Sequence, residues 1–351
     1  MNFLIFFISG LILSLIFTPI IRRISLLLSV VDSPDKQRKM HTRPTPLLGG
    51  VGVFFAFVTV LIIYINFGHP NLVVVPKHFL MSLVLGGVVL LLGGILDDKF
   101  DLSPALLWVF PAIAAMIVVV SGVGIGITEL SNPLGGTISL NFKVIGIPAA
   151  GALIWLWLMG MMFTTKFLDG LDGLVSGIGV IASITLFALS LTARIDQPIT
   201  ASVSIILAGC LLGFLVYNFH PASIFLGESG STFIGFALGV ISVLLGGKIA
   251  TAFLVMGIPI LDVAWVIGQR ILRGKSPFRA DRLHLHFRLL DAGFSVREAV
   301  VSLYCIAAIF GFTAVFLQSL GKLIALIFLL LIMIATSMFV RLGSFIKRSS
   351  R

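Results

Sequence analysis

Residues 77–103, KHFLMSLVLGGVVLLLGGILDDKFDLS, join a long apolar run to three carboxylates. The apolar part, about residues 77–96, has the length of a helix that spans a membrane. Asp97, Asp98 and Asp101 follow at its end. Ionisable groups at membrane depth are costly, so they usually mark a site, an ion path or a partner. This stretch therefore predicts a membrane helix that ends in a functional site.

The composition indicates a helical membrane protein. Hydrophobic residues make up 58% of the 351 positions and charged residues 11%, whereas a soluble domain carries about 25% charged residues. Apolar runs near 20 residues recur along the whole chain, whereas a β-barrel would show alternating segments of roughly ten residues. We therefore expect an all-α, polytopic bundle that forms a single domain over residues 1–351.

Hydropathy predicts about 10–11 transmembrane helices. The first run lacks a basic start and a small-residue cleavage site, so we expect it to be retained as a helix. Alternation and a Pro-Leu-Gly-Gly turn predict a short extracytoplasmic hairpin near 126–143. The expected spans are roughly 2–21, 48–67, 77–96, 105–122, 145–163, 174–193, 200–218, 230–245, 249–271, 298–317 and 322–340.

The distribution of Lys and Arg predicts the orientation of the chain. With the N-terminus outside, 19 of the 24 basic residues fall on the cytoplasmic side. The same arrangement puts every polar cluster of the sequence on that side. We therefore expect a cytoplasmic active site and C-terminus. The net charge of +10 then reflects topology and attraction to anionic lipid headgroups, and nucleic acid is not expected as a partner.

Two further clusters carry residue types that bind cations and phosphates. KFLDGLDGLVSG (166–177) contributes Asp169 and Asp172, and HPASIFLGES (220–229) contributes Glu228. Clustered carboxylates suit Mg²⁺ or Mn²⁺, because hard cations prefer oxygen ligands. The interleaved glycines let backbone N–H groups approach a phosphate closely. The pattern is typical of phosphoryl transfer.

A basic loop and one aromatic residue complete this set. The loop DRLHLHFRLL (281–290) carries Arg282, His284 and His286, which are suited to neutralising a diphosphate. Phe225 lies beside Glu228 in the sequence and is suited to stacking on a nucleobase.

Five segments in order resemble a known family. They are DSPDKQRKMHTRPTPLLGG, GGILDDKFDLS, KFLDGLDGLVSG, NFHPASIFLGESGSTFIGF and DRLHLHFRLLDAGFS, over about residues 32–294. Together they resemble the polyprenyl-phosphate N-acetylhexosamine-1-phosphate transferases of glycosyltransferase family 4. The DRLHLHF loop is most similar to the undecaprenyl-phosphate N-acetylglucosamine-1-phosphate transferase branch.

The resemblance implies a reaction at the bacterial cytoplasmic membrane. Members of the family move a sugar 1-phosphate from a UDP-sugar to a polyprenyl phosphate lipid, using Mg²⁺ and releasing UMP. The branch starts cell-surface polysaccharide or teichoic acid synthesis. A homodimer is compatible with it. The sequence leaves open whether the lipid phosphate attacks directly or through a covalent enzyme intermediate.

The resemblance also implies roles for individual residues. The catalytic candidates are Asp97, Asp98, Asp169 and Asp172, with Asp98 a candidate base. The metal ligands are expected to be Glu228, Asp98 and Asp172. The candidates for binding the substrate are Phe225 at the uracil and Lys166, Arg282, His284 and His286 at the diphosphate.

Four positions depart from the family pattern. Phe163 and Lys166 replace two asparagines, Glu228 replaces an aspartate, and Phe287 replaces a histidine. Lys166 lies three residues before Asp169, so we expect the two to pair if the helix continues. Such a pair would weaken metal binding. In the rival interpretations Lys166 contacts the diphosphate or points to the lipid headgroups.

Other interpretations of these patterns remain open. A catalytically impaired paralogue that binds polyprenyl phosphate or partner enzymes is the main alternative. A secondary transporter fits less well, because transporters place ionisable groups at the midplane and contain repeats. Residue by residue, Glu228 also fits a helix-capping role, and Phe225 a core or lipid-facing role. Asp262, in the middle of an expected span, is interpreted as structural.

Overall fold

The computed structural model describes residues 2–33, 44–67, 77–124, 129–132, 135–144, 146–245, 249–274, 276 and 283–349. The helices are α1 (Phe3–Leu27), α2 (Gly49–Phe67), α3 (Lys77–Phe100), α4 (Pro104–Val120), α5 (Ala149–Leu168), α6 (Leu174–Ser190), α7 (Pro198–Asn218), α8 (Gly227–Leu244), α9 (Ile249–Val255), α10 (Gly257–Leu272), α11 (Leu285–Asp291), α12 (Val296–Phe316) and α13 (Ser319–Ser349). The strands are β1 (Val31–Asp32), β2 (Thr45–Pro46), β3 (Glu129–Ser131), β4 (Thr137–Ser139), β5 (Lys143–Val144) and β6 (Ile147–Pro148).

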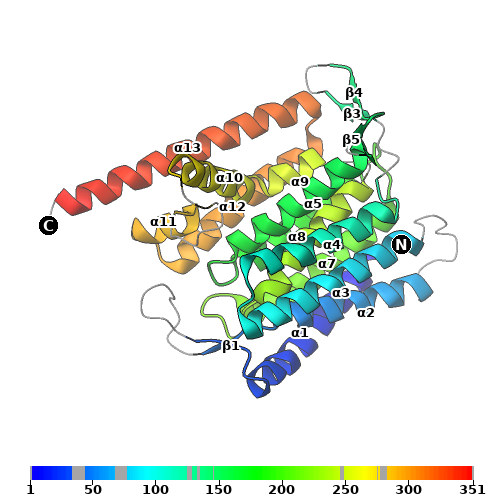
Figure 1. The fold of residues 1–351 in the computed structure, drawn as a ribbon, viewed down its shortest axis with the longest axis horizontal. Helices are drawn as coiled ribbons and strands as arrows, with labels where there is room; N and C mark the ends of the chain where they lie inside the picture. Colours follow the sequence, from blue (N-terminus) through cyan, green and yellow to red (C-terminus); the bar gives the residue numbers. More distant parts are fainter. Residues whose placement is uncertain are drawn as a thin grey trace.

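The expected all-α membrane bundle is confirmed. Eight of the described helices are long and apolar enough to cross a membrane, namely α1, α2, α3, α5, α7, α8, α12 and α13. The shorter apolar helices α4 and α6 coincide with two more expected spans. Most of the long helices lie side by side with similar axis directions, whereas α10 runs across them (Figure 1).

The ninth expected span, 249–271, was wrongly predicted as one continuous helix. It is broken at Met256 into α9 and α10, which meet at 81°. Pro259 has no N–H, so the carbonyl of Val255 loses its helical donor at the break. The hydrogen bonds on either side remain, from Met256 N–H to Ala252 and from Ile260 N–H to Met256, both at 2.9 Å.

The expected hairpin near 126–143 is present as a β-ladder. Glu129 in β3 faces Ser139 in β4, and the strands run antiparallel. Gly135 and Gly136 both have positive φ where the chain reverses, which is a conformation that favours glycine. A second small ladder, β5 with β6, follows it and was not predicted.

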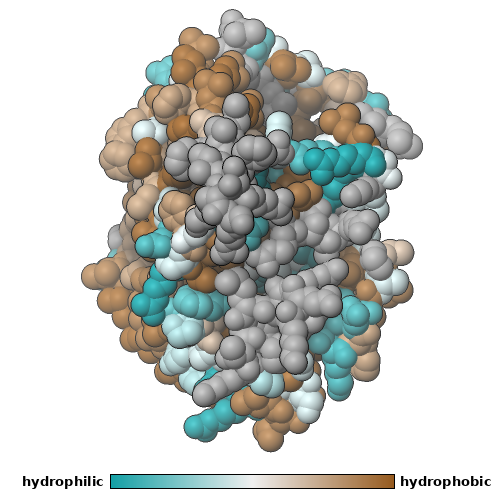
Figure 2. Space-filling view, turned by 90° about the vertical axis from the view of Figure 1, so that its left-hand side faces the viewer, coloured by the Kyte–Doolittle hydropathy of each residue, from teal (hydrophilic) through white to brown (hydrophobic). Residues whose placement is uncertain are grey.

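The two ends of the bundle differ in what they carry. The N-terminus and the strands β3, β4 and β5 lie at one end, whereas β1, α11 and the C-terminus lie at the other (Figure 1). Figure 2 looks onto that second end, where hydrophilic side chains lie between hydrophobic ones that gather toward the rim. The alternation of spans therefore brings the sequence clusters of 97–101, 166–172 and 220–228 to one end.

α8 is the central helix of the bundle, and its first turn is packed backbone against backbone. A Cβ on Gly50 in α2 would lie 2.1 Å from Gly230 Cα. A Cβ on Gly94 in α3 would lie 2.2 Å from the backbone nitrogen of Ser229. Real Cβ atoms do not approach that closely, so glycine is required at these crossings. They bring the polar end of α3 next to the start of α8.

Replacing one of these glycines should therefore loosen the bundle where the site forms. Gly94→Ala should lower the free energy of unfolding by about 1–3 kcal/mol, the usual cost of overpacking. Thermal unfolding in detergent micelles measures the loss. Gly160→Ala in α5 is the matched control, because nothing lies within 4 Å of its added Cβ. Equal unfolding temperatures for the two variants would contradict this packing.

Candidate functional site

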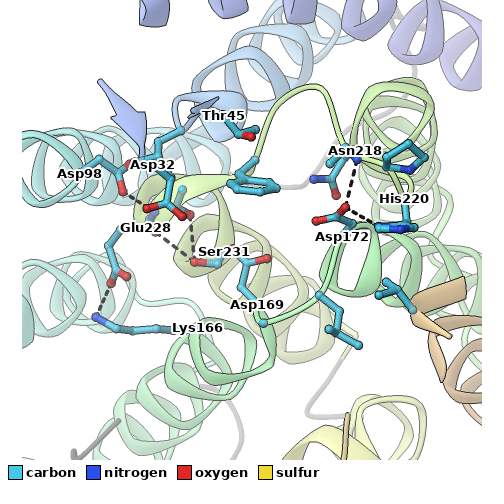
Figure 3. A pocket seen from close by; sticks show the side chains of 18 of the residues that line it. Asp32, Thr45, Asp98, Lys166, Asp169, Asp172, Asn218, His220, Glu228 and Ser231 are labelled. Carbon is cyan, nitrogen blue, oxygen red and sulfur yellow. Dashed lines mark hydrogen bonds and ion pairs between the residues drawn. The ribbon is translucent and has the colours of Figure 1, made fainter. Parts of the chain in front are cut away.

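A cavity of about 800 Å³ opens between the helices at the end that carries β1 and α11. Its walls come from α3, α5, the segment 169–172, the segment 218–228, α11 and the β1–β2 pair. Six carboxylates line it, from Asp32, Asp97, Asp98, Asp169, Asp172 and Glu228. All of them except Asp97 are labelled in Figure 3. Its volume is in the range of small-ligand sites. Asp32 and His220 are lining residues that sequence reasoning did not select.

Most of the sequence-predicted site residues meet in this cavity. Those that line it are Asp97, Asp98, Lys166, Asp169, Asp172, Phe225 and Glu228. His284 and His286 do not line it, although their neighbour Phe287 does. Arg282 lies outside the described residues. The roles assigned to individual residues remain predictions.

Asp98 joins α3 to the first turn of α8. Its Oδ1 accepts the backbone N–H of Glu228 at 3.0 Å, an N–H that the helix itself leaves without an acceptor. A carboxylate there also faces the positive end of the α8 dipole. Asp98 Oδ2 is buried without a hydrogen-bond partner among the described residues. Asp98 thus caps α8 and keeps one oxygen for a cation or a donor group.

Gly227 makes this approach possible. Its φ is +71°, in the left-handed region. A Cβ on Gly227 would lie 2.4 Å from Asp98 Oδ2 and 2.2 Å from the carbonyl oxygen of Leu47. A side chain at this position is therefore excluded on both grounds, which accounts for the glycine before Glu228.

Asp97 is partly used to end α3. Its Oδ1 accepts the backbone N–H of Leu102 at 2.9 Å, across a turn in which Asp101 has a φ of +52°. This contact fits the helix-end role of the cluster. Asp97 still lines the cavity, so it also contributes negative charge there.

Asp172 is held by the loop that follows α7. Its Oδ2 lies 2.8 Å from His220 Nδ1 and accepts the backbone N–H of Ala222 at 3.0 Å. The carbonyl of His220 in turn accepts from Arg297 Nε at 3.0 Å. A carboxylate that orients an imidazole is a common arrangement at functional sites. The only sequence signal for His220 was its place in the HPASIFLGES segment.

Asp169 is the carboxylate most strongly perturbed by its surroundings. It follows the last residue of α5 and lines the cavity, and the residue as a whole is exposed. Loss of solvation, with repulsion from Glu228 and Asp172, raises its pKa to about 8. A nearby cation would reverse this effect, because an opposite charge favours the ionised form.

Lys166 pairs with Glu228, so the expected pairing with Asp169 is wrong. Lys166 Nζ lies 2.6 Å from Glu228 Oε1 (Figure 3). The helical spacing that favoured Asp169 does not continue, because α5 ends at Leu168 and Asp169 has φ −74° and ψ 55°. Glu228, in the first turn of α8, is presented to Lys166 by the packing of α5 against α8.

His284 and His286 do not line the cavity, but His286 packs against Gly170, which does. His284 Nδ1 is 2.8 Å from Asp262 Oδ2, and Asp262 Oδ1 accepts the backbone N–H of Leu285 at 2.9 Å. Asp262 thus holds the start of α11, as its interpretation as a structural residue predicted. His286 stacks on His284 with ring centroids 5.7 Å apart, and burial lowers its pKa to about 3. A neutral His286 in this position supports the loop of 169–172 through its contact with Gly170.

The donor chemistry of the cavity fits a divalent cation. Carboxylate oxygens are the ligands that Mg²⁺ prefers, and Asp98 Oδ2 is a buried acceptor with no described partner. Asp98, Asp169 and Asp172 are the residues best placed to hold such an ion. No three Asp, Glu, His or Cys side chains of the described residues already converge as a ligand set.

The fold and the cavity define a polytopic membrane protein with an acidic site at one end of its bundle. A family model described as "Glycosyl transferase family 4" matches residues 80–246. A Bacillus subtilis (strain 168) protein named "Probable undecaprenyl-phosphate N-acetylglucosaminyl 1-phosphate transferase" is 32% identical over 320 residues, 89% of this chain and 84% of that protein. The chain therefore belongs to glycosyl transferase family 4, as its motifs indicated.

Two further relatives agree with this assignment. A Mycolicibacterium smegmatis (strain ATCC 700084 / mc(2)155) protein named "Decaprenyl-phosphate N-acetylglucosaminephosphotransferase" is 32% identical over 305 residues, 80% of this chain and 73% of that protein. A Salmonella typhi protein named "Undecaprenyl-phosphate alpha-N-acetylglucosaminyl 1-phosphate transferase" is 28% identical over 332 residues, 90% of this chain and 85% of that protein.

The raised pKa of Asp169 predicts how stability depends on pH when divalent cations are chelated. Its folded-state pKa of about 8 exceeds the value of 3.8 of an unperturbed Asp, so its contribution to stability is lost as the pH rises from about 4 to about 8. Asp169→Asn should remove this part of the loss. Unfolding temperatures in detergent with EDTA between pH 5 and pH 9 measure it. Asp196→Asn, in the α6–α7 connection, is the control, and equal slopes for the two variants would refute the prediction.

Proposed function

We propose that the protein transfers N-acetylglucosamine 1-phosphate from UDP-N-acetylglucosamine to undecaprenyl phosphate and releases UMP. The names of the relatives support the acceptor lipid and the sugar phosphate. The observation that carries the proposal is the acidic cavity at the end of an apolar bundle, lined by the motif residues that match the family. A lipid phosphate at the bilayer surface and a water-soluble nucleotide sugar meet at such a position.

The proposed reaction exchanges one phosphate linkage for another. A new P–O bond joins the lipid phosphate to the sugar 1-phosphate, and the P–O bond to UMP breaks. A phosphate monoester is largely ionised at neutral pH, so a general base adds little. Orientation and charge neutralisation then supply most of the acceleration.

The residues of the cavity divide this work. Asp98, capping α8, keeps its second oxygen for a cation that would bind the reacting phosphates, and Asp97 adds negative charge to the same cavity. Asp172 and His220 form a fixed polar pair on the opposite wall (Figure 3). Phe225 offers a ring for the nucleobase of the donor. A bound Mg²⁺ or Mn²⁺ would neutralise the diphosphate charge among these carboxylates.

The product of this reaction starts a cell-surface polysaccharide or teichoic acid. We also propose that the protein lies in the bacterial cytoplasmic membrane with its N-terminus outside and the cavity in the cytoplasm. The support is the excess of basic residues on the cavity side and the placement of the N-terminus and β3–β4 at the other end. A homodimer remains a prediction of the resemblance.

The proposed activity is tested with purified protein, undecaprenyl phosphate and a panel of UDP-sugars. UMP release should require both substrates, prefer UDP-N-acetylglucosamine and increase with Mg²⁺. Asp98→Asn and Asp172→Asn should each lower turnover by about 10²–10³-fold, because charge stabilisation is commonly a large catalytic term. Asn keeps an acceptor for the N–H groups of Glu228 and Ala222, so unfolding temperatures should change little.

The control for this assay is Asp196→Asn, far from the cavity, which should keep full activity. Absence of UMP release with every UDP-sugar would favour the impaired paralogue over the transferase. Near-normal turnover in both site variants would remove the cavity from the mechanism.

The orientation predicts which introduced cysteines react in intact cells. With Cys305 replaced by Ser, Thr137→Cys in β4 should react with a membrane-impermeant thiol reagent in intact cells. Ala292→Cys, directly after α11, should react only after permeabilisation. The excess of cytoplasmic Lys and Arg is the physical reason. The reverse labelling pattern would overturn the proposed orientation.

A further inference from the structure

We propose that Lys166 is a built-in counter-cation that withdraws Glu228 from divalent-cation binding, so that the ion is held by the other carboxylates of the cavity. This inference rests on the proposed function for the presence of the ion. It assigns Glu228 of this chain to an ion pair with Lys166 and not to the metal ion.

The contact itself is short and shielded. Lys166 Nζ lies 2.6 Å from Glu228 Oε1, and the two side chains are only 20% and 14% exposed. Charge-assisted hydrogen bonds of this kind are the strong ones, and salt screens a sheltered pair much less than a surface pair. A divalent ion that took Glu228 as a ligand would either displace the ammonium from Oε1 or bind the other oxygen close to the ammonium, whose positive charge repels it.

The backbone fixes the two partners in place. Lys166 lies in the last turn of α5 and Glu228 in the first turn of α8. Each charge is therefore on the end of its helix that the helix dipole favours. α5 and α8 are packed closely beside this pair, because a Cβ on Gly235 would lie 2.3 Å from Thr165 Oγ1. Phe163, one turn before Lys166, packs on Trp108 at 4.8 Å and anchors the same part of α5.

The remaining carboxylates leave room for an ion elsewhere in the cavity. Asp98 Oδ2 is buried and has no described hydrogen-bond partner, and the carboxylate of Asp169 lines the same cavity. A cation between these groups would satisfy both.

A rival account is that Lys166 leaves Glu228 to contact the donor diphosphate. In that account Glu228 is free to bind the ion whenever the substrate is present. Removal of the ammonium then lowers the affinity for the donor substrate and leaves the affinity for the metal ion unchanged. The two accounts differ in a measurement made with no substrate at all.

The test is a double-variant cycle on Mn²⁺ binding by the full chain in detergent, followed by the loss of the electron paramagnetic resonance signal of free Mn²⁺. Lys166→Asn should bind Mn²⁺ about tenfold more tightly than the wild type. Glu228→Gln should have little effect in the wild type, where the carboxylate is already paired. In the Lys166→Asn background it should abolish the gain.

Two further variants serve as controls. Lys99→Asn removes the same charge from the same end of the molecule, where Lys99 is exposed beside Phe100, so it should not reproduce the gain. Lys166→Arg keeps the charge and should keep the wild-type affinity. Lys166→Gln provides a second neutral variant, and unfolding temperatures verify that each protein is folded.

Equal Mn²⁺ affinity in the wild type and both neutral variants would overturn the proposal. So would a loss of affinity on Glu228→Gln that is as large in the wild type as in Lys166→Asn. UMP release is measured separately on the same preparations. A cycle that behaves as expected in a protein without transferase activity would refute the proposed function and leave the Lys166–Glu228 assignment standing.

Discussion

The close backbone contact at the start of α8 is the constraint on which the site depends. Gly50 in α2 and Gly94 in α3 let two helices reach the first turn of α8 at distances that exclude a Cβ. Gly94 and Asp98 are four residues apart and so lie on one face of α3. The same contact that packs the helices therefore delivers the Asp98 carboxylate to the N–H of Glu228. The packing of α3 on α8 and the position of Asp98 in the site therefore depend on the same contact.

A second theme is the excess of negative charge in the cavity. Six carboxylates face a space whose proposed substrates are themselves anionic. The structure offsets part of this charge with its own groups: the N–H of Glu228 at Asp98, the N–H of Leu102 at Asp97, His220 and the N–H of Ala222 at Asp172, and the ammonium of Lys166 at Glu228. No such hydrogen bond reaches Asp169 from the described residues, and loss of solvation with repulsion from Glu228 and Asp172 raises its pKa. A mobile cation completes the neutralisation in the proposed function.

Helix α10 explains how a segment far along the chain contributes to the cavity. Because the chain bends by 81° at Met256, α10 departs from the direction of α9. Asp262 on α10 then holds His284 and the first N–H of α11. The ordered histidines pack under Gly170 and place Phe287 on the wall. The basic loop thus acts in this structure as a support for the 169–172 segment.

The sequence by itself determined the membrane class, nearly all the helices and the end of the bundle at which the motifs gather. These features follow from apolar run length and from the alternation of spans, which are local and additive properties. Only the tertiary structure decided the partners: Glu228 for Lys166, His220 for Asp172, Asp262 for His284. Each pair joins residues at least 22 positions apart. Their meeting depends on helix crossings and on where a helix stops, and spacing along one helix carries no information about either.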